Sequence, residues 1–332
     1  MKCLRFALAP LVLWITPLAG VLAADPPRHW TQEWDRTDFS RASIDFDEIR
    51  SGGPPKDGIP AIDRPTYRAP GEVDDIGDRE PVITVSLGGE TRAYPVRILI
   101  WHEIANDTLG GVPIAVTFCP LCNSAIVFER RVDGQLFDFG TTGKLRNSDL
   151  VMYDRQTESW WQQFTGEAIV GKMMGARLTA LPARIESFER FLARTEGEAN
   201  VTVLVPTFAA MRNYGANPYS RYDRSTKPFL YNGHLPENIA PLERVVVVGE
   251  EAWSLALVQR LKRIERGDLV ITWVPGQNSA LDTRMIRMGR DIGNVVVQRQ
   301  GPDGLADAVH DISFAFAFHA FYPEAPIHNE IE

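Results

Sequence analysis

Short runs of β-branched and aromatic residues, bounded by Gly, Pro or Asp, recur along the chain and are typical of β-strands. The predicted strands cover residues 114–117, 125–128, 150–153, 201–205, 245–248, 269–273, 295–297 and 314–321. Helical periodicity is found mainly at residues 95–105, 185–193 and 253–263. This pattern predicts a β-rich α+β protein.

Residues 1–23 have the pattern of a cleavable signal peptide. Lys2 and Arg5 precede an apolar run that ends at Ala23. Pro10 and Pro17 interrupt this run, which is short for a bilayer span, so a retained membrane anchor is the weaker alternative. We therefore expect a periplasmic or otherwise extracytoplasmic protein that is not inserted in a membrane after cleavage.

Two segments of the chain resemble each other, which predicts an internal repeat. Residues 114–125 read IAVTFCPLCNSA and residues 269–280 read LVITWVPGQNSA. Further matching segments surround both in the same order. Residues 82–86 match 245–248, residues 93–94 match 252–253, and residues 150–156 match 294–300. Chance similarity of apolar strands is the alternative. The second copy has Val274 and Gln277 in place of Cys119 and Cys122, so the turn does not need the thiols for its shape.

The repeat divides the mature chain into related halves. We expect an extended Pro- and Gly-rich arm at residues 24–80, a cysteine-bearing half at 81–206 and a degenerate second half at 207–332. A disordered linker is the alternative for the arm.

Composition and charge narrow the range of partners. Cleavage removes Cys3 and leaves Cys119 and Cys122, an even pair in an oxidising compartment. It also removes Lys2 and Arg5, which lowers the 35 basic residues to 33 against 43 acidic ones, a net charge of about −10. Such a charge argues against nucleic acid and anionic membranes as partners. The chain has no phosphate-binding glycine loop, so no nucleotide cofactor is expected.

Several motifs together resemble those of a bacterial family known as domain of unknown function 3179. They are residues 52–63, Ala93-Tyr94-Pro95, residues 101–107, residues 117–125, and residues 151–159 with Trp161 and Gln163. The resemblance implies membership of that family but no agreed reaction.

The Cys119-Pro-Leu-Cys122 spacing suits a metal clamp, a dithiol–disulfide couple or a small structural ring. The ring is the weakest of these, because closing so short a loop restricts the unfolded chain little. A thioredoxin fold is also disfavoured, because the residues after Cys122 continue as a strand and not as a helix.

For a metal site, His102 is the natural third ligand, and thiolates with an imidazole suit copper or zinc. Met152 and His319 are weaker candidates, since a Met in a strand is more often part of the core. A supporting pocket is expected from six polar or aromatic residues, which are Asn106, Asp107, Ser124, Asp154, Glu158 and Trp161. For the segment from Asp154 to Trp161, a hydrogen-bonded turn is an equal alternative.

The sequence thus favours an exported protein that binds copper or zinc through its two thiols. A disulfide oxidoreductase of another fold, or a non-enzymatic periplasmic binding module, are the alternatives. Its partner is a small molecule, a metal ion or a periplasmic protein, and the residues leave open whether it is an enzyme.

Overall fold

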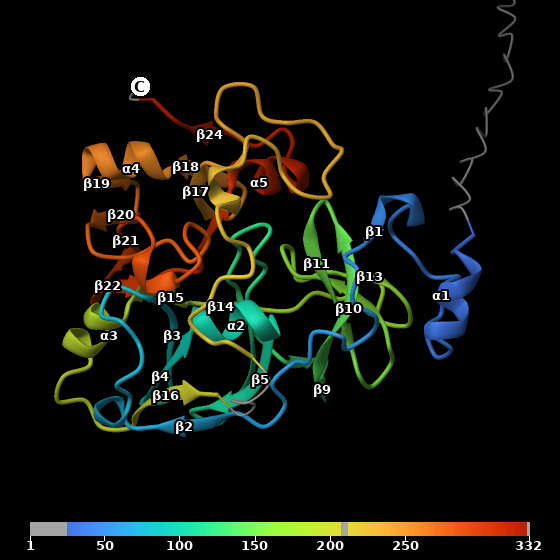
Figure 1. Ribbon diagram of the computed structural model, residues 1–332, viewed down its shortest axis with the longest axis horizontal. Coiled ribbons are helices and arrows are strands. Elements are labelled where there is room, and N and C mark those ends of the chain that lie inside the picture. Colours follow the sequence, from blue (N-terminus) through green and yellow to red (C-terminus); the bar gives the residue numbers. More distant parts are fainter. Residues whose placement is uncertain (1–24, 207–211, 331–332) are drawn as a thin grey trace, which may run out of the picture.

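A computed structural model describes residues 25–206 and 212–330 (Figure 1). The expected β-rich composition is confirmed, with 39% strand and 15% helix, and five sheets of four or five strands form a propeller-like arrangement. The predicted signal peptide at residues 1–23 lies outside the described residues. None of the described helices is long and apolar enough to cross a membrane.

The first half contributes two neighbouring sheets and two helices. One sheet has the order β15-β3-β4-β16-β2, with bounds β15 (Arg184–Ser187), β3 (Pro81–Leu87), β4 (Glu90–Pro95), β16 (Val201–Val205) and β2 (Thr66–Arg68). The other has the order β14-β7-β6-β5, with bounds β14 (Ala180–Leu181), β7 (Val127–Glu129), β6 (Val112–Thr117) and β5 (Ile104–Leu109). Helices α2 (Val96–His102) and α3 (Phe188–Arg194) follow β4 and β15.

The second half has the same plan. One of its sheets has the order β23-β17-β18-β24, with bounds β23 (Asp311–Phe314), β17 (Arg244–Val248), β18 (Glu251–Ser254) and β24 (Ile327–His328). The other has the order β22-β21-β20-β19, with bounds β22 (Gly304–Asp307), β21 (Asn294–Gly301), β20 (Leu269–Val274) and β19 (Arg263–Arg266). Helices α4 (Leu255–Leu261) and α5 (Ala315–Phe321) follow β18 and β23, as α2 and α3 follow β4 and β15.

Four strands of the fifth sheet lie between β7 and β14 in the chain, and β1 joins them from the N-terminal segment; the sheet has no counterpart in the described part of the second half. Its order is β1-β10-β11-β12-β13, with bounds β1 (Ile49–Ser51), β10 (Phe139–Arg146), β11 (Asp149–Asp154), β12 (Trp160–Gln162) and β13 (Ala168–Val170). A small ribbon, β8 (Arg131–Val132) with β9 (Gln135–Leu136), precedes it. Helix α1 (Arg28–Glu33) packs Trp30 against Trp160 at the right of Figure 1.

Each of the three predicted helices is present but begins later than the sequence pattern indicates. Residue 185 lies in β15, and α3 begins only after Ser187, whose side chain accepts a hydrogen bond from the Arg190 N–H. Ser254 caps α4 in the same way, by accepting from the Leu257 N–H. A capping hydroxyl satisfies an otherwise unpaired N–H of the first turn, so it fixes where a helix begins.

One predicted strand is wrong. Residues 315–321 form helix α5, and His319 lies on it. The alternation of Phe and Ala suggested a strand, but Ala315, Phe316 and Ala317 are all buried. A segment buried on every side carries no periodicity that separates helix from strand.

One predicted match of the internal repeat is also wrong, that of residues 150–156 with residues 294–300. Residues 150–154 belong to β11, in the inserted fifth sheet, whereas β21 pairs with β20 in the register Ile271↔Val297. The matching pair in the first half is Val116↔Val127, between β6 and β7. The counterpart of β21 is therefore β7.

A single hydrophobic cluster joins the two halves. It contains Phe118 of the first half together with Leu281 and Phe316 of the second. The turn after β6 therefore lies where the halves meet.

Candidate functional site

The two cysteines lie on a tight turn between β6 and β7. The Cys119 N–H donates to the Ser124 carbonyl at 2.8 Å, and the Ser124 N–H donates back to the Cys119 carbonyl at 3.2 Å. Asn123 adopts a φ of 53°, in the left-handed region that Asn tolerates better than most residues. This closed turn holds both thiol side chains on one short piece of backbone.

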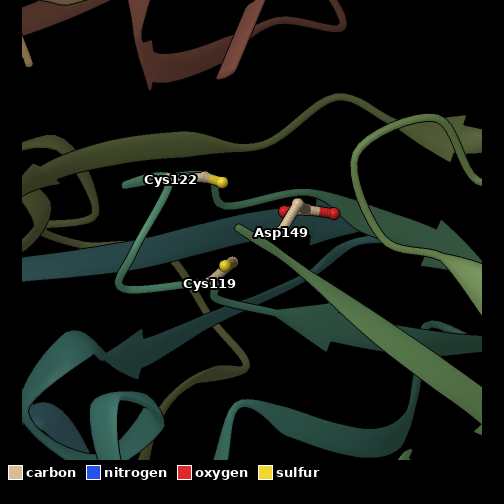
Figure 2. A group of neighbouring side chains, drawn as sticks. All are labelled: Cys119, Cys122 and Asp149. Atoms are coloured by element: carbon tan, nitrogen blue, oxygen red, sulfur yellow. The ribbon is translucent and has the colours of Figure 1, made fainter. Parts of the chain in front are cut away.

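A carboxylate that the sequence did not single out completes the group. Asp149 is the first residue of β11, directly after a hairpin in which Asn147 and Ser148 have positive φ values of 52° and 65°. The sulfur atoms of Cys119 and Cys122 and a carboxylate oxygen of Asp149 lie within 4.8 Å of one another (Figure 2). All three side chains are buried, with relative exposures of 2%, 0% and 0%.

Asp149 is held by one of its two oxygens. Its Oδ2 accepts hydrogen bonds from Gln162 Nε2 at 2.6 Å and from the Phe164 N–H at 3.0 Å. Its Oδ1 is buried and has no hydrogen-bond partner within residues 25–206 and 212–330. A buried polar atom of this kind is costly without a partner, and here the thiols are its neighbours.

Burial favours the protonated forms of Cys119, Cys122 and Asp149. It raises the pKa of Asp149 to about 7, although the hydrogen bonds from Gln162 and Phe164 oppose the shift. Burial also raises the pKa of the Cys119 thiol, and that of Cys122 well above its usual value. Removing a negative group from water disfavours its charged form, so all three groups favour neutrality.

A second buried acid lies next to the thiols. Glu103 follows α2 with a φ of 60°, and its carbonyl accepts a hydrogen bond of 2.8 Å from the Phe118 N–H. Burial and the nearby charge of Asp149 raise its pKa to about 8. The charge of Glu103 in turn raises the pKa of Cys119. The ionisable neighbours that raise the pKa of Cys119 are thus both acidic.

Strand β23 of the second half fixes the turn from the other side. The Phe314 N–H donates to the Cys122 carbonyl at 2.8 Å, and Asn123 Nδ2 donates to the Ile312 carbonyl at 2.6 Å. Asp311 Oδ1 accepts from the Ala125 N–H at 2.8 Å. The geometry of the thiol turn therefore depends on both halves.

His102 is not brought to the thiols. Its Nδ1 lies 2.7 Å from the Pro60 carbonyl oxygen and its Nε2 lies 2.7 Å from the Tyr214 hydroxyl. The three-residue group within 4.8 Å contains Asp149 and not His102. In place of the expected His102, a carboxylate from a strand in another sheet lies beside the thiols.

Asn106 and Asp107 stabilise other parts of the first half. The Asn106 side chain donates to the Phe139 carbonyl and accepts from its N–H, which ties β5 to β10. Asp107 accepts hydrogen bonds from Tyr67, Tyr94 and Arg92. Its two oxygens therefore have partners.

The turn after β11 is held by hydrogen bonds within itself and by ion pairs to the N-terminal segment. Asp154 accepts from Trp161 Nε1 at 2.9 Å and from the Thr157 hydroxyl at 2.8 Å. Glu158 pairs with Lys56 at 2.7 Å and with Arg36 at 2.9 Å. This is the hydrogen-bonded turn that the sequence left open as an alternative to a pocket.

Of the six expected supporting residues, Ser124 lies in the thiol turn itself. Its hydroxyl is buried without a hydrogen-bond partner in the described part of the chain. The sequence missed Asp149, Gln162 and Glu103. The local signal for Asp149 was an acidic residue at the start of an apolar strand, directly after the Asn-Ser pair.

The comparison with families of known sequence gives one match. No curated protein and no solved structure matches the chain. The family described as protein of unknown function DUF3179 matches residues 56–325, which is most of the chain. The match includes both halves as well as the thiol turn, and the chain therefore belongs to the DUF3179 family.

Proposed function

We propose that this protein is an exported metal-binding protein in which Cys119, Cys122 and Asp149 hold one zinc or copper ion. The observation that supports this most is the approach of two sulfur atoms and a carboxylate oxygen to within 4.8 Å of one another. Tetrahedral zinc binds thiolate at about 2.3 Å, which places two thiolate ligands about 3.7 Å apart. The group is therefore close to the size that an ion requires.

The charges around the thiols also favour a cation. Burial raises the pKa values of both thiols and of Asp149, and the acidic neighbours add to the shift of Cys119. A divalent ion replaces the protons on these groups and neutralises most of the resulting negative charge. The unpartnered Oδ1 of Asp149 supplies a ligand atom without breaking either hydrogen bond at Oδ2.

The donor set favours zinc over copper. Soft Cu(I) prefers sulfur ligands, whereas zinc accepts thiolate and carboxylate together. A tetrahedral zinc site needs one more ligand. Glu103 is the candidate from this chain, because it is buried and its charge acts on Cys119, although its carboxylate lies outside the group within 4.8 Å.

Burial counts against the disulfide oxidoreductase. Thiol–disulfide exchange requires that a partner reach a sulfur atom, and reactive cysteines are partly exposed with a lowered pKa. Cys119 and Cys122 are 2% and 0% exposed, and burial raises the pKa of both. The closeness of the two sulfur atoms is the observation that keeps this second function testable.

We also propose that the two halves arose by duplication. Three features support this: the shared strand orders, the seven-residue helices α2 and α4, and the positive φ of the residue that follows each helix, 60° at Glu103 and 64° at Lys262. The Phe118 N–H donates to the Glu103 carbonyl as the Trp273 N–H donates to the Lys262 carbonyl. Cys119 therefore corresponds to Val274, which is 39% exposed.

Metal analysis of the protein purified from the periplasm tests the proposed function. We expect about one zinc ion per chain, and none in the Cys119→Ser/Cys122→Ser variant. Asp149→Asn should lose most of the metal. Asp154→Asn, at the other end of the same strand, is the matched control and should keep it.

Two results would overturn the metal proposal. One is a wild-type protein with no more zinc or copper than the double serine variant, even after anaerobic reconstitution. The other is a native Cys119–Cys122 disulfide with a potential above about −300 mV, which is the behaviour of a redox couple and not of a permanent bridge.

A further inference from the structure

A cavity of about 170 Å³ lies where the two halves meet, between residues of β7 and β14 on one side and residues of β17 and the start of β23 on the other. The first half lines it with apolar side chains, which include Phe128, Phe164 and Leu178. The second half contributes Val247 from β17 and the pair His310 and Asp311 at the start of β23. Apolar cavities of about 150 Å³ accommodate a benzene ring, so this cavity has the size of a small ring compound.

One oxygen of Asp311 in this cavity lacks a partner. Asp311 is 6% exposed, and its Oδ1 accepts from the N–H groups of Ala125 and Ile312, each at 2.8 Å. Its Oδ2 is buried without a hydrogen bond of normal geometry among the residues that the structure describes, although the Ser124 hydroxyl lies close enough to this carboxylate to lower its pKa. A carboxylate oxygen in this state requires a donor.

The neighbouring histidine offers a second acceptor. His310 Nδ1 lies 2.9 Å from the Ala308 carbonyl oxygen, so Nδ1 carries the proton. Burial lowers the pKa of His310, which keeps the ring neutral and makes Nε2 an acceptor. None of the described residues around the cavity is Lys or Arg. The polar end of the cavity therefore suits a hydrogen-bond donor and repels a carboxylate.

We propose that this cavity is a binding site for a small apolar molecule that carries a primary amine. The ammonium group donates to Asp311 Oδ2 and to His310, and the apolar part packs against Phe128, Phe164 and Leu178. An ion pair with a hydrogen bond in a buried setting is stronger than a neutral bond, which selects the amine over an alcohol. This proposal does not depend on metal at the thiols.

Three probes of the same shape test the site on the mature, full-length protein. Benzylamine, benzoate and toluene share one ring and differ in the group that reaches Asp311. Calorimetry and thermal shift at pH 7.5 should show binding of benzylamine, at least tenfold weaker binding of toluene, and no binding of benzoate.

Two variants locate the binding. Asp311→Asn keeps an oxygen for the Ala125 N–H but replaces the free acceptor by a donor, so benzylamine affinity should fall at least tenfold. Asp311→Asn also alters a residue that hydrogen-bonds to the segment after the thiol turn, so a second variant is needed. Ala180→Phe fills the cavity from β14 and leaves Asp311 unchanged. It should abolish benzylamine binding with an unchanged circular dichroism spectrum. Asp303→Asn, on an exposed turn, should bind as the wild type does.

The proposal fails if benzylamine does not bind at millimolar concentration. It fails equally if benzylamine and toluene bind alike and Asp311→Asn changes neither, because the cavity would then be an apolar void. Zinc content measured on the same samples keeps this result separate from that of the thiol site.

Discussion

The backbone N–H of Phe314 donates a 2.8 Å hydrogen bond to the carbonyl oxygen of Cys122. The two residues are far apart in the chain, since 191 positions separate Cys122 from Ser313, the residue before Phe314. The Ser313 hydroxyl donates to the same carbonyl at 3.1 Å. The second half, which has no counterpart of the cysteines, thus holds the turn that carries them. Its contribution to the site is positional.

The stability of the metal-free protein should fall as pH rises. Burial raises the pKa of Asp149 to about 7 and that of Glu103 to about 8, while both carboxyls have values near 4 in an unfolded chain. Between these limits the folded state binds more protons than the unfolded state, so raising the pH favours unfolding. Each group contributes at most about 1.4 kcal/mol per pH unit. Urea denaturation of chelator-treated protein from pH 5 to 8 measures the slope.

The Asp149→Asn variant measures how much Asp149 contributes to this dependence of stability on pH. The variant should gain stability relative to the wild type as pH rises from 5 to 7, and parallel curves would contradict the assignment. The comparison also removes the effect of His102 and His310, whose lowered pKa values cost stability at acidic pH in both proteins. With excess zinc the wild-type trend should reverse, because metal binding releases protons from the thiols and the carboxyl.

Asn123 should be more sensitive to Ala than to Gly. Both substitutions remove the hydrogen bond from Nδ2 to the Ile312 carbonyl, which costs about 1–3 kcal/mol for a buried partner. Only Ala adds the strain of a left-handed φ of 53°, which destabilises the protein by about a further 1–2 kcal/mol. Denaturation of the two variants side by side measures this difference. Equal stabilities would mean that the turn relaxes when Asn123 is lost.

His102→Gln should destabilise the protein without removing metal. His102 is buried and both ring nitrogens lie at hydrogen-bond distance from other groups, so the loss should be about 1–3 kcal/mol. Zinc content at saturating metal should equal that of the wild type. A loss of zinc as complete as in Cys119→Ser would restore His102 as a ligand.

The exported protein should begin near Ala24. Cleavage after residue 23 removes Cys3, so intact mass spectrometry of periplasmic protein should give a chain with two cysteines. Alkylation under denaturing and reducing conditions should therefore add two labels. Three labels, or a mass that includes residues 1–23, would show that the segment is retained.

Much of the fold could be predicted from local patterns. The β-branched runs at residues 114–117 and 269–273 are strands because extended backbone suits such side chains and because turn residues bound each run. The repeated order of strands around the two turns was also visible. The helix at residues 315–321 was not, because its first four side chains are buried on every side of the helix and only packing decides its conformation.

The sequence by itself determined the thiol pair and the turn that carries it, since both depend on residues close together in the chain. The tertiary structure decided which groups meet the thiols. Asp149 reaches them from a strand of the inserted sheet, and sequence distance gives no measure of such a contact. Of the neighbours His102 and Glu103, it is Glu103 whose charge acts on Cys119, whereas His102 lies against the Pro60 carbonyl and the Tyr214 hydroxyl. These contacts come from segments far apart in the chain, so only the packing of the folded protein sets them.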